Sequence, residues 1–326
     1  MHPLRRWRVA LLVALMCARA TSARASFAYD SVHADGVAST ATKFDGDGVT
    51  VWDGRVIFAP NASAAVGVFE PATNAFTLVP IGAVVEFEGG ALANDGRVAF
   101  APAADHSLVG VFDPETDTFE SVVSETTTAE TIAFGASRPF VGAARLGDGR
   151  IAFAPYQATF VMVFDPATGT SATHDLPAPL GDATIGKFAG AAATPDGCVV
   201  FAPSAADAAG RFCVDGASAS GFALELVALA SDSPLLGLPD KFSGAVATER
   251  GDVIFAPLLA DATVTYERER VSGFARLASR CGRRTCRSPT RRRTSSPAAP
   301  RCPTDAWFSF RATPRRRPSS TRRTGR

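Results

Sequence analysis

The sequence has few of the side chains from which metal sites and catalytic triads are built. Its 326 residues contain four histidines, three tryptophans and three methionines, and the histidines follow no common spacing. A nucleophile elbow, a phosphate-binding glycine loop and a Cys-x-x-Cys pair are also absent. The spacing of these residues therefore indicates neither a metal site nor a catalytic triad. We predict no metal site and no cofactor.

Apolar runs long enough to span a bilayer are absent too, because a transmembrane helix needs about 20 such residues. The N-terminal run from Val9 to Cys17 is shorter, and it lies between the basic stretch 5–8 and the small-x-small sequence 23–25. This order is typical of a signal peptide. We predict a signal peptide at residues 1–25, no membrane span, and a secreted protein or one of the endomembrane lumen. A frayed N-terminal arm or an organelle transit peptide is the alternative.

Helical periodicity is missing, so the sequence offers no crossover helix for a parallel βαβ fold. Instead it repeats itself. The tripeptide Phe-Ala-Pro recurs, and a phenylalanine precedes each copy at nearly constant spacing. The prolines are Pro60, Pro102, Pro155, Pro203 and Pro257, and the preceding phenylalanines are Phe44, Phe87, Phe140, Phe188 and Phe242.

Each repeat holds four short runs of β-branched and aromatic residues separated by turns. Examples are the run 55–59 after an Asp-Gly turn and the run 109–112 before the turn 113–116. Four strands at a period of about 40 to 50 residues are typical of a β-propeller blade. We predict an all-β fold over residues 26–279, a β-propeller of about five four-stranded blades starting near residues 43, 86, 139, 187 and 241, or an incomplete propeller of six or seven blades.

The first strand of each blade is expected to line a central channel, where small residues such as Gly89-Gly90-Ala91 leave room. Lys43, Lys187 and Lys241 open three of these strands, and Glu86 replaces the lysine in blade two. A ring of ammonium groups at one level would favour a small anionic ligand, or a protein, at the channel mouth. The alternative is that each lysine only tethers a neighbouring blade.

Several aspartates resemble ligand sets but have simpler explanations. Asp45, Asp47 and Asp53 alternate with glycines, yet they lack the spaced carboxylates and terminal glutamate of a calcium loop. We therefore interpret them as turn residues. Asp113, Asp165 and Asp215 each begin the second turn of a blade, where an aspartate accepts backbone N–H bonds.

Two further features agree with a secretory route. Asn61-Ala62-Ser63 is a glycosylation sequon, expected in the loop between the second and third strands of blade one. Cys198 and Cys213 occupy the positions of Arg97 and Val111, so they are expected to lie opposite each other on adjacent strands of blade four. A disulfide there would suit an oxidising compartment, and two separately buried thiols are the alternative.

From about residue 280 to residue 326 the sequence becomes rich in Arg, Pro, Ser and Thr, without a strand pattern. A basic disordered tail is the ordinary interpretation. We instead hypothesise a frameshift, because Trp307 through Arg311, read from the last base of each codon, permit a second-strand motif. A sixth blade would then lie in the other frame, and Cys281, Cys286 and Cys302 would be artefacts. We draw no nucleic-acid partner from the tail.

The segments Asp148–Pro155, Val163–Gly169 and Asp175–Pro177 resemble the repeat of virginiamycin B lyase-like and NHL-type propellers, over roughly Lys43 to Tyr266. The resemblance implies the propeller fold. In such a lyase, a channel-mouth histidine with a metal and acidic partners opens a cyclic ester. His174 is expected at the outer edge of blade three, so that role is not transferred to it, and no gluconolactonase-like set of Glu, Asn and Asp is located.

The function predicted from the sequence is a secreted or lumenal propeller that acts as a ligand- or protein-binding scaffold and as a monomer. The alternative is a metal-assisted lyase or lactonase, the one case that implies a divalent metal. An enzyme would bring several carboxylates or histidines with perturbed pKa values together at one channel mouth.

Overall fold

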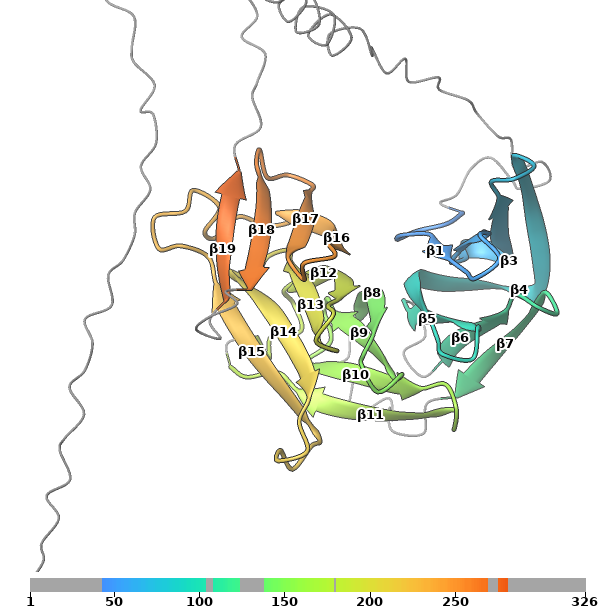
Figure 1. Ribbon diagram of the computed structural model, residues 1–326, viewed down its shortest axis with the longest axis horizontal. Helices are drawn as coiled ribbons and strands as arrows, with labels where there is room; N and C mark the ends of the chain where they lie inside the picture. Colours follow the sequence, from blue (N-terminus) through green and yellow to red (C-terminus); the bar gives the residue numbers. More distant parts are fainter. Residues whose placement is uncertain (1–42, 104–107, 124–137, 179, 269–274, 281–326) are drawn as a thin grey trace, which may run out of the picture. The chain divides into compact units, whose positions relative to one another are not determined.

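The computed structural model describes residues 43–103, 108–123, 138–178, 180–268 and 275–280. Every regular element within these residues is a β-strand, and the predicted fold class, an all-β propeller, is confirmed, with five blades in the described part of the chain (Figure 1). No helix in this part of the chain is long and apolar enough to cross a membrane. The predicted signal peptide and residues 281–326 of the tail lie outside the described residues.

The strands follow in antiparallel order from the inside of each blade to the outside. Blades one and two comprise β1 (Val49–Thr50), β2 (Val56–Phe58), β3 (Asn61–Glu70), β4 (Ala75–Leu92), β5 (Val98–Pro102), β6 (Leu108–Asp113) and β7 (Thr118–Val123). Blades three and four comprise β8 (Phe140–Arg145), β9 (Ile151–Pro155), β10 (Phe160–Asp165), β11 (Thr170–Asp175), β12 (Phe188–Ala193), β13 (Val199–Pro203), β14 (Ala208–Val214) and β15 (Phe222–Ala228). Blade five comprises β16 (Phe242–Ala247), β17 (Val253–Pro257), β18 (Thr263–Arg268) and β19 (Ala275–Arg280).

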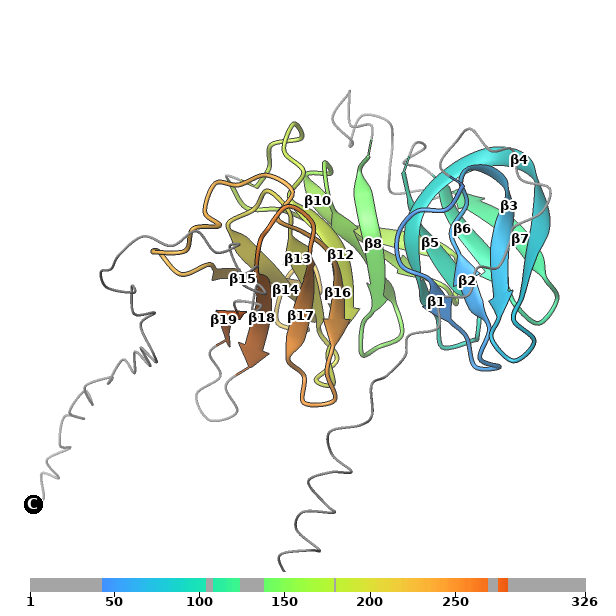
Figure 2. The ribbon, with the colours of Figure 1, turned by 90° about the horizontal axis from the view of Figure 1, so that it is seen from above.

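The first two blades share a strand. The 18 residues of β4 pair with β3 at their start and with β5 at their end, so the chain crosses the predicted blade boundary near 86 without a break (Figure 2). This pairing also corrects the expected position of the sequon. Asn61 is not in a loop, because the extended β4 brings Glu86 alongside it and makes it the first residue of β3. Its side chain is half-buried.

The repeated Phe-x-Gly bends each inner strand at the same point. The phenylalanine pairs with the proline of Phe-Ala-Pro, as in Phe188 with Pro203, and the register then shifts. The glycine at this bulge has a φ of +99° in Gly190, and its counterparts are also left-handed. A Cβ on Gly190 would lie 2.5 Å from the Cα of Gly244 in the next blade. Glycine is therefore needed here both for backbone conformation and for the close approach of two blades.

The core lies between blades, where unlike faces meet. One face of each blade carries Ala and Val, and it packs on the phenylalanine face of the next blade. Between blades three and four, for example, Ala152 and Val163 pack in one cluster with Phe188 and Phe201. All four are at most 1% exposed. The alternation of side chains along each strand thus builds one apolar cluster at each interface between neighbouring blades.

The Asp-Gly-Arg turns explain a further part of the repeat. Arg55 binds Asp53 in its own turn and donates to the carbonyl of Pro114 in blade two. Arg97 repeats the arrangement, with Asp95 and the carbonyl of Pro166 in blade three, the latter at 2.6 Å. Each arginine therefore ties its blade to the second turn of the next. The predicted role of that turn's aspartate is confirmed, since Asp113, Asp165 and Asp215 each accept a backbone N–H two residues on.

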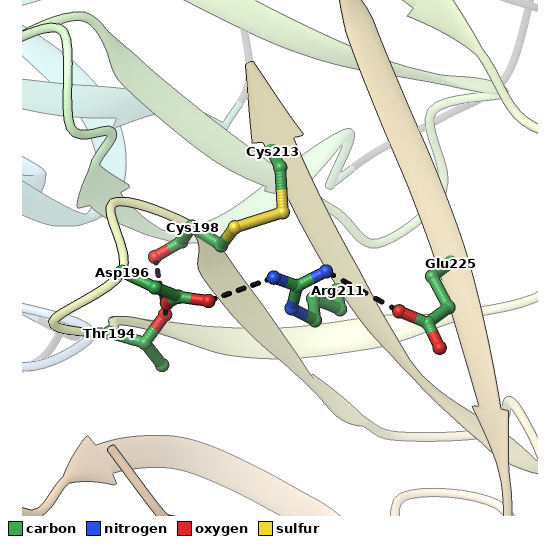
Figure 3. The surroundings of a disulfide bond; sticks show 6 residues. All are labelled: Thr194, Asp196, Cys198, Arg211, Cys213 and Glu225. Carbon is green, nitrogen blue, oxygen red and sulfur yellow. Dashed lines mark hydrogen bonds and ion pairs between the residues drawn. A yellow bond between two sulfur atoms is a disulfide. The ribbon is translucent and has the colours of Figure 1, made fainter. Parts of the chain in front are cut away.

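Blade four replaces this arginine with Cys198, which forms a disulfide with Cys213 on the adjacent strand (Figure 3). The two residues lie opposite each other, with a Cα–Cα distance of 4.4 Å. Asp196 of the same turn binds Arg211 of β14 at 2.8 Å instead. The disulfide links two strands within one blade.

Candidate functional site

The inner strands line a channel of about 540 Å³. Its wall consists almost wholly of small side chains, because the residue after each bulge glycine is short. The lining residues are Asp47, Gly48, Gly89, Gly90, Gly142, Ala143, Ala191, Ala192, Ala193, Ala245, Val246 and Ala247. Asp47 is the single ionisable residue among them.

The Asp47 carboxylate has no hydrogen-bond or ion-pair partner among the residues that the structure describes. Its carboxylate lies near the fifth bulge glycine, since a Cβ on Gly244 would be 3.6 Å from both Asp47 oxygens. The side chain is accessible from the channel, but the surrounding walls remove part of its hydration, and this desolvation raises its pKa. An accessible, unpaired carboxylate in a chamber of small residues can hold a positively charged group.

A second polar group, the mouth cluster, consists of Asp45, Glu88, Arg138, Tyr156 and Asp240. It lies at the end where the inner strands begin. Arg138 forms two 2.6 Å bonds to the Glu88 carboxylate and lies 3.7 Å from that of Asp45. Its guanidinium carbon is 5.4 Å from the centre of the Tyr156 ring. The Tyr156 hydroxyl donates to Asp240 at 3.2 Å. These contacts join blades one, two and three to the connections that precede blades three and five.

The charges of the mouth cluster do not balance, since three carboxylates face one guanidinium. Burial raises the pKa of Glu88, against the opposing effect of Arg138. Burial and the Asp240 carboxylate raise the pKa of the Tyr156 hydroxyl, so it remains a donor at neutral pH. The Glu88 bond raises the pKa of Arg138 despite its partial burial. Within the cluster, carboxylates therefore outnumber cationic groups.

The lysines singled out in the sequence are used within loops. The Lys187 ammonium donates to the carbonyls of Asp182 at 2.7 Å and of Gln157 and Ile185 at 3.2 Å, and the side chain is fully buried. Lys241 is equally buried and donates to the carbonyls of Leu238 and Ala205 and to Asp207.

These contacts reach into the preceding blade, which fits the tethering interpretation better than an anion site. Glu86 is exposed, Lys43 is half-buried, and the backbone carbonyl of Lys43 accepts a bond from the Asn61 amide. The structure thus does not bring the four side chains together around one ligand.

His174 lies on β11, the outer strand of blade three, and its Nδ1 is 2.9 Å from the Ser220 hydroxyl. In the described parts of the chain, no three His, Cys, Asp or Glu side chains are grouped as a metal site would require. The carboxylates of the mouth cluster are held by Arg138 and Tyr156 instead.

Sequence reasoning missed Asp47, Arg138, Tyr156 and Asp240 as site residues. A signal existed for Asp47, because its equivalents in the other blades are Gly90, Ala143, Ala191 and Ala245, and it alone carries a charge in that column. Arg138 and Asp240 lie in connections between blades, where the repeat gives no alignment, so their contact with Glu88 and Tyr156 required the structure.

The fold and channel define the chain as a β-propeller. No protein-family model matches the sequence, and neither does any curated protein. Among solved structures, virginiamycin B lyase from Staphylococcus aureus is similar with a TM-score of 0.54 and 13% identity, covering 72% of this chain and 70% of that one. An auxiliary nutrient binding protein from Bacteroides ovatus has a TM-score of 0.51 and 12% identity, covering 73% and 57%.

The predicted fold-level resemblance to virginiamycin B lyase-like propellers is confirmed. At such identities the likeness shows the fold alone. Because propellers with this fold include both lyases and a binding protein, the choice between these functions depends on the site of this chain.

Proposed function

We propose that this protein is a secreted or lumenal β-propeller that binds a small cationic ligand in its channel. The observation that carries the proposal is the unpaired Asp47 carboxylate in a channel of about 540 Å³ walled by glycine and alanine. Small walls admit an alkyl or hydroxylated body, and the carboxylate selects a positive charge. A cation replaces the anion expected from the lysine pattern, because two of the lysine ammonium groups are buried and bonded to loop carbonyls.

The mouth cluster supports the same charge preference. Its excess of carboxylates attracts cations toward the channel and repels anions. The Glu88–Arg138 pair and the Tyr156–Asp240 bond connect several blades, so they also hold the mouth in one geometry. A preorganised rim lowers the ordering cost of binding.

Secretion, glycosylation at Asn61 and a monomeric state remain parts of the proposal. The Cys198–Cys213 disulfide supports the compartment, because such bonds persist under oxidising conditions. The alternative function, a metal-assisted lyase or lactonase, is favoured by the lyase structures of the same fold. It would need metal ligands beyond those that the described residues group together.

The test is calorimetric titration of the protein with propylammonium, tetramethylammonium and spermidine, beside acetate and sulfate as anions. We expect at least one amine to bind saturably, and Asp47→Asn to weaken its binding by about 10- to 100-fold, because one charge pair is removed. Asp53→Asn is the matched control, since Asp53 serves an exposed turn. Amine binding that Asp47→Asn leaves unchanged, or binding of anions only, would refute the proposal.

A further inference from the structure

The Ala and Val face of blade five has no partner among the described residues. Val246 is 67% exposed and Ile254 is 42% exposed. Their equivalents in blades two to four, such as Ala144 and Ala152 of blade three, are at most 7% exposed, because the next blade covers them. A cavity of about 510 Å³ lies over this face, with Ile254 and Thr265 in its lining.

Blade one has the complementary deficit on its phenylalanine face. Phe44, Phe58 and Phe76 contact each other at ring-centroid distances of 5.6 to 6.1 Å, but all three are only half-buried. Their counterparts in later blades, such as Phe188 and Phe201, are fully buried. The exposed face of blade five thus lacks a neighbouring phenylalanine face, and the exposed face of blade one lacks a neighbouring Ala and Val face. One blade presents both.

The nucleotides that encode the tail carry a blade pattern in another frame. An amino acid fixes the first two bases of its codon unless it is Ser, Arg or Leu. In the Ser- and Arg-rich tail, a frame that joins the last base of one codon to the first two bases of the next is therefore fixed at some positions and only permitted at others. Asp305 followed by Ala306 must give arginine or cysteine, and Trp307 followed by Phe308 must give valine. Phe308 followed by Ser309, with a TCN serine codon, gives phenylalanine or leucine.

Over positions 294–310 this frame permits Lys-Phe-Ser-Gly, then Pro-Asp-Gly-Arg-Val-Val-Phe, then proline. The lysine and the last proline have the spacing of Lys187 and Pro203 in blade four, and the motifs between them keep their blade-four offsets. Position 309, the counterpart of Ala202, gives a large apolar residue instead of alanine. Positions 318–321 permit Val-Phe-Asp-Pro, at the spacing that separates Pro155 from Asp165 in blade three. A chance match would have to satisfy all of these positions in one phase.

We infer that the native protein has a sixth blade, encoded by these nucleotides in the shifted frame, which packs between blade five and blade one. Its phenylalanines at positions 295 and 308 would cover Val246 and Ile254. Its opposite face, with valine at position 307, would cover Phe44 and Phe58. Each contact repeats the unlike-face packing of the other blades. The printed tail, with Cys281, Cys286 and Cys302, is then a product of the wrong frame.

The first test is sequencing of transcripts across the codons from Arg280 to Thr294, where the inference expects a single-base or two-base difference from the printed frame. The second compares two full-length proteins, the printed chain and the chain with the frame restored. In each, Val246→Cys is labelled with a thiol reagent and the modified site is identified by peptide mass. The restored blade should slow labelling at least about tenfold, because the thiol then reacts only during local opening.

Val123→Cys is the control, since Val123 is 60% exposed on the outer strand of blade two and should label at the same rate in both proteins. The restored chain should also unfold at a higher urea concentration than the printed chain. The inference is overturned if transcripts carry the printed frame without exception. It is also overturned if Val246→Cys labels equally fast in both proteins, or if the restored blade leaves the unfolding midpoint unchanged or lowers it.

Discussion

Replacing Gly190 by alanine should destabilise the propeller more than replacing a left-handed glycine that has open space around it, such as Gly54. Gly190 has a φ of +99°, and an added Cβ would meet the Cα, N and C atoms of Gly244 at 2.5 to 2.9 Å. The backbone conformation alone costs about 1–2 kcal/mol for an L-residue. Overpacking against a backbone adds about 1–3 kcal/mol, since no flexible side chain can yield and the blades must separate. The sum, about 2–5 kcal/mol, is a large part of a typical domain's stability.

Two glycines serve as matched controls for this prediction. Gly54 has a φ of +90° with no atom within 4 Å of an added Cβ, so Gly54→Ala measures the conformational cost alone. Gly244 has a φ of +97°, and a Cβ added to it would lie 3.6 Å from the Asp47 oxygens, an ordinary van der Waals distance. Gly244→Ala should therefore also show little beyond the conformational cost. Urea unfolding followed by far-ultraviolet circular dichroism gives each free energy. If Gly190→Ala costs no more than Gly54→Ala, the close approach of the blades is not what requires glycine.

Three other outcomes are expected. Replacing Cys198 and Cys213 together by serine should lower the free energy of unfolding by about 3 kcal/mol, because the bond closes a loop with a sequence separation of 15; an unchanged urea midpoint under non-reducing conditions would contradict this. Burial lowers the pKa of Lys187 to about 8 from 10.5, so between these values the unfolded chain binds more protons and stability rises with pH, by at most about 3 kcal/mol. Lys187→Met should abolish that rise, which parallel urea titrations at pH 7.5 and 10 would show. The pKa of Asp47 is raised in the folded protein, so its protonated form is favoured there. The stability that it contributes at low pH is therefore lost as the pH rises through this raised pKa. Asp47→Asn should therefore change the melting temperature more favourably at pH 7, where it removes a desolvated charge, than at pH 3. The same substitution should weaken cation binding.

The repeat made the fold predictable because the same physical requirement recurs in each blade. Phe188 must fill the space between two blades, Gly190 must bend the inner strand, and Pro203 ends the second strand, so these residue types return in phase. The Cys198–Cys213 pairing followed from the same alignment. The continuous β4 was not predictable, because its path depends on pairing with both β3 and β5 and not on its own sequence.

The candidate site was less accessible from sequence, for the opposite reason. The ring of lysines was visible because it repeats, yet the structure shows Lys187 and Lys241 bonded to loop carbonyls of the scaffold. Repetition identifies what every blade needs in order to pack against its neighbour. A ligand is contacted by a few blades in unequal ways, so its contacts need not repeat.

Departures from the repeat are therefore the better guide to function in this fold. Asp47 stands where the other blades have glycine or alanine, and it brings a charge into a channel that packing would leave neutral. Its desolvation disfavours the ionised form and it has no described partner to compensate, so the scaffold gains nothing from it. A costly residue in an accessible chamber is explained if a cationic ligand supplies the missing partner. Alanine at this position, which the other blades show to be structurally sufficient, should retain the fold and lose the binding.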